Sequence, residues 1–267
     1  MKKGIFIIGS FVLVVSVILV VITRHQGDRD LPDILSDGRL TVLIDSGEHG
    51  FTKDSAKVYG FQYEVVKRFA DELGVELAII QEPDHLQGNK ELTEGGCDII
   101  VSMQPLLPDS GRQIVSVHPL VETNLMLVQL PDSAGNLTVS TQYQLDSCEI
   151  VVVKASPFSS LLSYLADDLA IHPVVSESNY TTLDELVKGV ASGEIRYTIC
   201  PAYLTKRLQK RYPEVDMSLP LTFHLQLGWT VRGTAVELKS KLDEFIRNFV
   251  GTADYQTLFN TYFELKN

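Results

Sequence analysis

The chain has 267 residues, and its 23 basic and 34 acidic residues give a formal net charge of −11. This excess of acidic residues is not typical of proteins that bind nucleic acids or anionic membrane surfaces, which need clustered Lys and Arg. Three cysteines are too few, and odd in number, for a disulfide framework. We therefore predict that Cys97, Cys148 and Cys200 are buried, unpaired thiols.

The first 30 residues predict export. Lys2 and Lys3 precede an apolar run over residues 5–22, which as a helix is about 27 Å long, close to the roughly 30 Å hydrocarbon core of a bilayer. Basic residues before the run favour a cytoplasmic N-terminus. The alternative is a cleaved signal peptide, whose apolar region is usually about 7–15 residues and ends in a small-x-small pattern. We predict a retained signal anchor and a short polar tether in residues 1–30, at the inner (cytoplasmic) membrane, with the bulk of the chain in the periplasm.

After this leader, short β-branched runs alternate with amphipathic stretches. The helical stretch 61–73 places its apolar residues on one face and is followed by Gly74, a helix stop signal. The order strand, helix, strand, helix, strand predicts a mostly parallel sheet covered by helices. The expected elements are residues 40–45, 61–73, 76–81, 90–94 and 98–102.

The same alternation restarts in the second half of the chain. The run 149–154 is nearly all β-branched, as expected of a strand buried on both faces. Two similar α/β units predict two lobes, with a cleft where the carboxyl ends of the strands face each other. The further expected elements are a helix at 158–169, a strand near 174–175, a helix at 182–191, a strand at 197–200, and helices at 201–212, 236–250 and 253–263.

Several segments carry a family resemblance. Residues 59–64 (YGFQYE) with 69–75 (FADELGV), and residues 95–100 (GGCDII), resemble the signature of family 3 extracellular solute-binding proteins. Residues 193–199 and 227–231 are most similar to the binding domain of membrane-bound lytic murein transglycosylase F.

The resemblance implies a type II periplasmic-binding-protein fold, α/β, with two hinged lobes. Residues 31–122 with 224–267 are expected to form lobe 1, and residues 123–223 lobe 2. Because the sequence stops where the transglycosylase's catalytic domain would begin, we expect a binding module and not an enzyme.

The resemblance also implies candidate ligand-binding residues. Arg112 falls near the family arginine that holds a ligand carboxylate through a two-pronged contact, although a solvated loop arginine is the alternative. Ser156, Phe158 and Ser159 begin a helix after a strand, where amide groups and the helix dipole favour an anion. The alternative there is an ordinary helix cap by Ser156.

Further candidates lie at the ends of expected strands. Pro201 stands where amino-acid-binding members of the family place an Asp for the ligand ammonium, so a conventional α-amino site is not expected. We predict a carboxylate-bearing ligand that is amino-acid-like, a peptide or a peptidoglycan fragment. The remaining candidates are Asp45, Ser46, Met103, Gln104 and Pro105, with Tyr59 as an aromatic wall.

These features predict a membrane-anchored solute-binding domain with a sensor or accessory role in the cell envelope. The alternatives are a substrate-binding receptor of an ABC transporter with a cleaved leader, and a small dehydratase-like enzyme on the same fold. The sequence has no G-x-S-x-G, P-loop or H-E-x-x-H motif. We expect no metal or cofactor, and as partners a small ligand, the membrane through the N-terminal helix and an envelope protein, but no nucleic acid.

Overall fold

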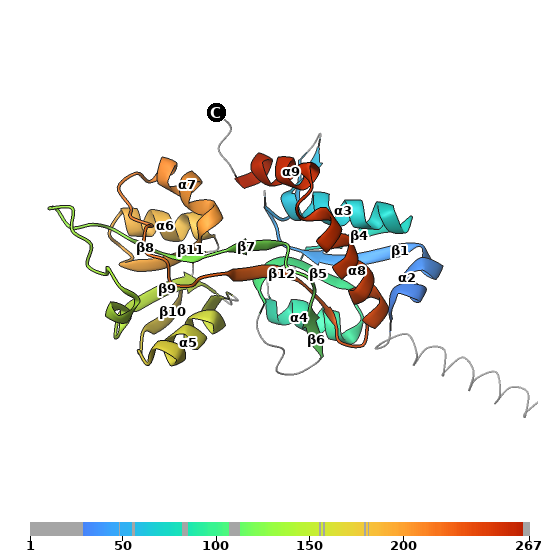
Figure 1. The fold of residues 1–267 in the computed structure, drawn as a ribbon, viewed down its shortest axis with the longest axis horizontal. Helices are drawn as coiled ribbons and strands as arrows, with labels where there is room; N and C mark the ends of the chain where they lie inside the picture. The colour runs from blue at the N-terminus through green and yellow to red at the C-terminus, as the bar shows by residue number, and fades with distance from the viewer. Residues whose placement is uncertain are drawn as a thin grey trace, which may run out of the picture.

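The computed structural model describes residues 29–263, except 48, 55–56, 82–84, 107–112, 155, 157, 179 and 181. This part of the chain forms two lobes joined by long strands (Figure 1). Within it, no helix has the length and apolar character needed to cross a membrane. The apolar run at residues 5–22 lies outside the described residues.

Lobe 1 is built around one six-stranded sheet in the order β4-β1-β5-β12-β6, with β7 also paired to β12. β1 is parallel to β4 and β5, as predicted, whereas β12 from the C-terminal part of the chain runs antiparallel to β5. The sheet is therefore mixed. Its strands are β1 (Arg39–Ile44), β4 (Glu76–Ile80), β5 (Ile99–Pro105), β6 (Ile114–Ser116), β7 (Val121–Thr123) and β12 (Leu225–Arg232), beside a small hairpin of β2 (Thr52–Lys53) and β3 (Val58–Tyr59).

Helices from both ends of the described chain cover this sheet. The central one, α3, has the predicted bounds and buries its apolar face, and it ends at Gly74, whose φ of 70° is a left-handed cap. Trp229 of β12 is fully buried and donates a hydrogen bond through Nε1 to Gln62 of α3. The helices are α2 (Leu31–Asp37), α3 (Phe61–Leu73), α4 (His85–Glu94), α8 (Val236–Phe249) and α9 (Ala253–Phe263).

In lobe 2 the described strands form two separate pairs. β8 (Leu125–Gln129) is antiparallel to β11 (Tyr197–Pro201), and β9 (Glu149–Val153) is parallel to β10 (Val174–Ser178). The hydroxyl of Thr198 on β11 donates to the carbonyl of Val151 on β9 at 2.7 Å and so ties the two pairs together. The helices are α5 (Phe158–Leu169), α6 (Leu183–Ala191) and α7 (Ala202–Arg211), with a short 3-10 turn, η1 (Gln142–Leu145).

The chain passes between the lobes twice, side by side. β7 pairs with β12 in lobe 1, and β8 begins just after Asn124 in lobe 2 (Figure 1). The amide of Leu125 donates a hydrogen bond to the Thr222 hydroxyl, and the amide of His224 donates to Oδ1 of Asn124. These bonds hold the two crossing segments together at their midpoint.

Arg29 and Asp30 are built into lobe 1. Arg29 pairs with buried Asp98 at 2.9 Å, and Arg232, only 2% exposed, pairs with the same carboxylate and donates to the Arg29 carbonyl. Asp30 caps α2 and also accepts from the amide of Leu238 in the first turn of α8. The described end of the expected tether is therefore part of the folded lobe.

The three cysteines are unpaired, as predicted, but only Cys97 and Cys200 are buried. Burial raises the pKa of each of these two thiols to about 12. Cys148 is half-buried and donates to the carbonyl of Gln144 in η1, because it lies in the turn before β9 and not within the strand. The prediction of three buried thiols is wrong at this position.

Candidate functional site

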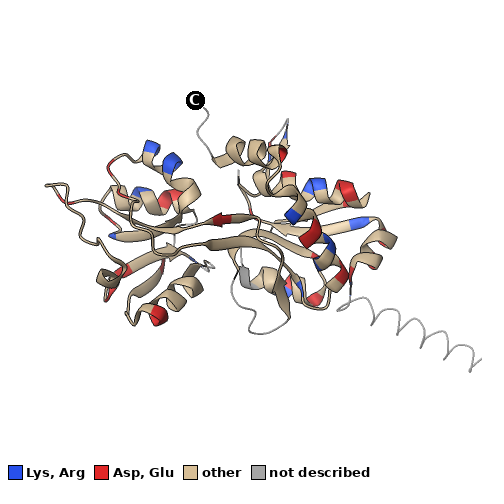
Figure 2. Ribbon diagram, in the orientation of Figure 1, with Lys and Arg blue, Asp and Glu red and all other residues tan. Residues whose placement is uncertain are grey.

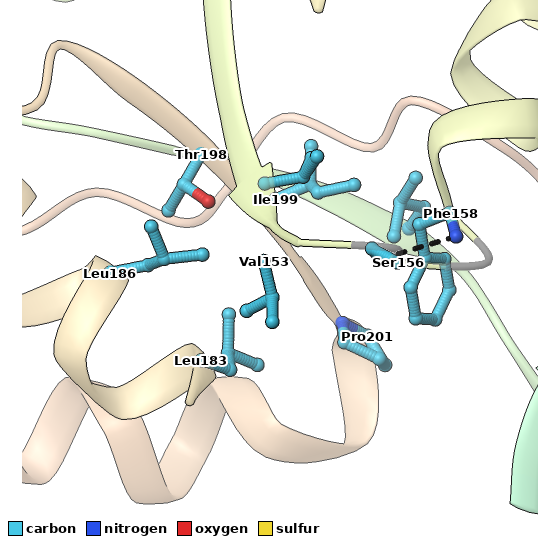
Figure 3. Close-up of a pocket in the computed structure, with 10 residues that line it drawn as sticks. Val153, Ser156, Phe158, Leu183, Leu186, Thr198, Ile199 and Pro201 are labelled. Atoms are coloured by element: carbon cyan, nitrogen blue, oxygen red, sulfur yellow. Dashed lines mark hydrogen bonds between the residues drawn. The ribbon is translucent and has the colours of Figure 1, made fainter. Parts of the chain in front are cut away.

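A mostly apolar cavity of about 120 Å³ lies where β9 and β11 end and α5 begins (Figure 3). The structure brings three residues predicted from the sequence, Ser156, Phe158 and Pro201, to this cavity. Carboxyl ends of strands are where open α/β sheets bind ligands. The other lining residues are Leu125, Val152, Val153, Leu183, Leu186, Thr198 and Ile199.

At the start of α5, Ser156 supplies a polar side chain to this cavity, whereas Ser159 is not among the lining residues. The Ser156 hydroxyl accepts from the Phe158 amide at 3.3 Å, so Ser156 bonds to the first turn as a capping residue does. The Ser159 hydroxyl is buried and has no hydrogen-bond partner among the described residues. Since α5 packs with β5 of lobe 1, this helix start faces the other lobe. Its amides and dipole favour an anionic group there.

Pro201 is the last residue of β11 and occupies the cap position before α7. It is buried, and its side chain carries neither a charge nor a hydrogen-bonding group. This position of the cavity wall therefore offers nothing to a ligand ammonium group.

The predicted strand-end residues of lobe 1 lie apart from this cavity. Asp45 follows β1 and accepts from the Ser102 hydroxyl at 2.5 Å. Ser46 is bonded to the Gln81 amide at 3.0 Å. The residues Met103, Gln104 and Pro105 were expected to follow a strand, but they are the last residues of β5 itself, because pairing with β12 extends that strand.

The remaining predictions concern Tyr59 and Arg112. Tyr59 lies in β3, is half-buried and packs against the hydrophobic core of lobe 1. Arg112 lies outside the described residues. The ligand-binding roles of all the predicted residues stay predictions.

A second cavity, of about 490 Å³, lies between the lobes. Sequence reasoning named only Ser46 among its lining residues. One signal in the sequence could have indicated this cavity, because four of its lining residues recur at helical spacing on one face of α7. They are Leu204, Arg207, Leu208 and Arg211. Lobe 1 contributes Ser46, Gly47 and His49, and lobe 2 contributes Thr182, Leu183, Asp184, Leu204, Arg207, Leu208 and Arg211.

The charged groups of this second cavity have polar partners. Arg211 pairs with Asp184 at 2.8 Å, and the Tyr212 hydroxyl donates to the same carboxylate at 3.1 Å. Burial, and then this hydrogen bond to Asp184, raise the pKa of Tyr212. Arg207 of lobe 2 lies 3.5 Å from the ring nitrogen Nε2 of His49 in lobe 1.

Aromatic rings also join the lobes. Tyr203 on α7 packs edge-on against Phe263 of α9, with centroids 4.8 Å apart, and against Phe259. Burial is the main cause that raises the pKa of Tyr203. The lobes are thus in contact on the side of α7 and α9. Over the described residues, no group of three His, Cys, Asp or Glu side chains is placed to hold a metal ion.

Comparison with curated proteins finds similar chains among bacterial wall enzymes. The chain is 28% identical over 220 residues to a membrane-bound lytic murein transglycosylase F from Shewanella denitrificans, covering 81% of this chain and 43% of that protein. It is 25% identical over 231 residues to the protein of the same name from Alteromonas mediterranea, covering 82% and 49%. The chain therefore spans about half the length of these relatives. No protein-family model matches it.

Comparison with solved structures identifies the fold. An ancestral arginine-binding protein bound to arginine superimposes with a TM-score of 0.67 at 19% identity, covering 85% of this chain and 98% of that one. The fold is that of the type II periplasmic binding proteins. At 19% identity, the similarity to this structure shows the fold and not the ligand. The sequence resemblance to the solute-binding domain of transglycosylase F is also confirmed.

Proposed function

We propose that this chain is a solute-binding domain whose lobes close on a small ligand that bears a carboxylate. The observation that carries the proposal is the cavity at the ends of β9 and β11, where Ser156 and the first turn of α5 face lobe 1. Similarity to transglycosylase F, and to a fold whose solved member binds arginine, supports a binding role.

The cavity wall indicates what the rest of the ligand is like. Val153, Leu183 and Ile199 make it apolar, and Pro201 leaves an ammonium group without a partner. Burying an unpaired charge is costly, because nothing replaces its hydration. We therefore infer a ligand with an aliphatic side chain whose amino group is acylated, as it is in a peptide.

We further propose that the domain is anchored by residues 5–22 at the cytoplasmic membrane, with a sensor or accessory role in the envelope. The proposed lobe boundaries are the crossings at residues 123 and 224, where the two segments meet beside Asn124. N-terminal sequencing of the exported protein tests the anchor. A start at residue 1 supports it, and a start between residues 25 and 31 would show a cleaved leader and favour a transport receptor.

The binding proposal is tested by calorimetric titration of the purified full chain with N-acetyl-L-leucine and with L-leucine. We expect N-acetyl-L-leucine to bind and to be recovered unchanged, and L-leucine to bind roughly tenfold or more weakly, since an unpaired charge costs well over 1.4 kcal/mol.

A matched variant reverses one feature of the cavity. In Pro201→Asp the new carboxylate can cap α7, because Asp is a favourable cap residue, so the fold should be kept. We expect this variant to gain affinity for L-leucine and to lose affinity for the acetylated form. Equal binding of both compounds by the native chain and by the variant would contradict the ligand assignment, and turnover of either compound would contradict a purely binding role.

A further inference from the structure

The two cavities share one wall. Leu183, the first residue of α6, lines both the small apolar cavity and the large one between the lobes. The large cavity, at about 490 Å³, has roughly four times the volume of the small one. The two cavities are therefore neighbours, and a ligand with its aliphatic part in the small cavity would reach the large one by passing around the Leu183 side chain.

The large cavity differs from its neighbour in charge. Its lining residues include two guanidinium groups, Arg207 and Arg211, against the single carboxylate of Asp184. The whole chain has a net charge of −11, yet α7 carries a group of basic side chains (Figure 2). The local field at this cavity therefore favours an anion although the chain as a whole is acidic.

Neighbouring side chains fix the positions of Arg207 and Arg211. Asp184 holds Arg211 at 2.8 Å and is itself held by the Tyr212 hydroxyl, so the guanidinium group is directed along the first turn of α6. Arg207 lies one helical turn earlier, next to His49 of the opposite lobe. A planar guanidinium presents several donors at fixed spacing, which suits a carboxylate better than a point charge does.

An anion in this cavity would touch both lobes. Ser46 and Gly47 line it from lobe 1, and Arg207 lines it from lobe 2. A group that binds both lobes at once interacts with the closed arrangement more strongly than with an open one, and so shifts the population toward closure.

We infer that the cavity lined by Arg207 and Arg211 binds a second carboxylate of the same ligand. The inference rests on the proposed function, because it extends the ligand of that site. The ligand class is then an N-acylated amino acid with an aliphatic side chain, whose acyl chain ends in a carboxylate.

The test uses two probes that differ only in that terminal group, N-succinyl-L-leucine and its succinamoyl analogue, in which an amide replaces the carboxylate. Titration of the purified full chain should give roughly tenfold or more tighter binding of N-succinyl-L-leucine, the contribution of a charge-assisted hydrogen bond. Arg207→Gln should remove most of this preference and Arg211→Gln part of it. Lys210→Gln is the matched control, because it makes the same change of charge on α7 outside the lining residues, and it should keep the preference.

The outcomes separate this inference from the proposed function. If N-acetyl-L-leucine binds but the native chain does not distinguish the two longer probes, the second carboxylate site is wrong and the first cavity stands. If the preference survives Arg207→Gln and Arg211→Gln together, the assignment to these arginines is wrong. If none of the three N-acylated leucine compounds binds, the proposed function fails and the second site fails with it.

Discussion

Six strands of lobe 1 are hydrogen-bonded into one sheet beside the β2–β3 hairpin, whereas the described strands of lobe 2 form two separate pairs. In lobe 1 the interior is closed by fully buried Trp229 and by the ion pairs of Asp98. In lobe 2 the Thr198 hydroxyl on β11 donates to the Val151 carbonyl on β9 and so joins the inner strands of the two pairs.

This difference coincides with the position of the small cavity. Thr198 itself lines it, as do Val152 and Val153 at the end of β9. A sheet that is paired along its whole length leaves no room between its strands, since neighbouring strands lie only about 4.8 Å apart. The small cavity of lobe 2 thus lies at the ends of β9 and β11, which belong to different strand pairs, whereas the sheet of lobe 1 is continuous.

The largest expected effect tests the closed interior of lobe 1. Arg232→Met removes a buried cation that pairs with Asp98 and donates to the carbonyls of Leu92 and Cys97. Breaking a buried pair from one side costs about 3 kcal/mol or more. Urea unfolding should show this loss, and Arg247→Met on the exposed face of α8 should stay within about 0.5 kcal/mol. Similar values for both variants would contradict a structural role for the network.

The second prediction uses alkaline pH to probe lobe 1. Burial raises the pKa of Tyr255 to about 12, and its hydroxyl donates to the Leu120 carbonyl. The protonated form is therefore favoured on folding. The protonated Tyr255 hydroxyl therefore contributes about 2 kcal/mol to the free energy of unfolding. This contribution is complete at pH values below the pKa of unfolded tyrosine, near 10, and is lost as the pH rises toward 12.

In Tyr255→Phe the free energy of unfolding should fall less steeply between pH 10 and 12 than in the native chain. Exposed Tyr143→Phe is the control and should leave that slope unchanged. The buried thiols of Cys97 and Cys200, whose pKa values are also raised to about 12, should retain part of the slope. An unchanged slope in Tyr255→Phe would show that this hydroxyl is not buried.

The third prediction compares the lobes directly with one substitution in each. Thr198→Val keeps the shape but leaves the Val151 carbonyl without its donor, so it should cost about 1–1.5 kcal/mol. Thr230→Val in lobe 1 removes a buried hydroxyl that has no partner among the described residues, so it should be neutral or stabilising. Chemical denaturation of both variants checks this, and the opposite ranking would remove the distinction between the lobes.

The smallest expected effect concerns the start of α5. Ser156→Ala removes the acceptor of the Phe158 amide and should cost about 0.5–1 kcal/mol. Ser163→Ala, later in the same helix, should be neutral or slightly stabilising because Ala favours helix interiors. Thermal unfolding measures both, and a loss in Ser163→Ala as large as in Ser156→Ala would argue against a capping role.

The helices were predictable from the sequence because their signals are local. The bounds of α3, α5 and α9 agree with those expected, since each helix has an apolar face and a stop or start residue beside it. The antiparallel position of β12 was not predictable, because its partner β5 lies more than 100 residues earlier. The same holds for the burial of Arg232 and for the cavity at Arg207, which depend on residues that only the folded chain brings together.

The contacts of Arg29 and Asp30 determine how mechanical load would enter the molecule. Both residues lie at the start of α2, at the end of lobe 1 farthest from lobe 2 (Figure 1). A pull on the chain before Arg29 would therefore act first on ion pairs and helix caps within lobe 1. The chain before α2 is thus joined to one lobe alone, away from the segments that cross to lobe 2.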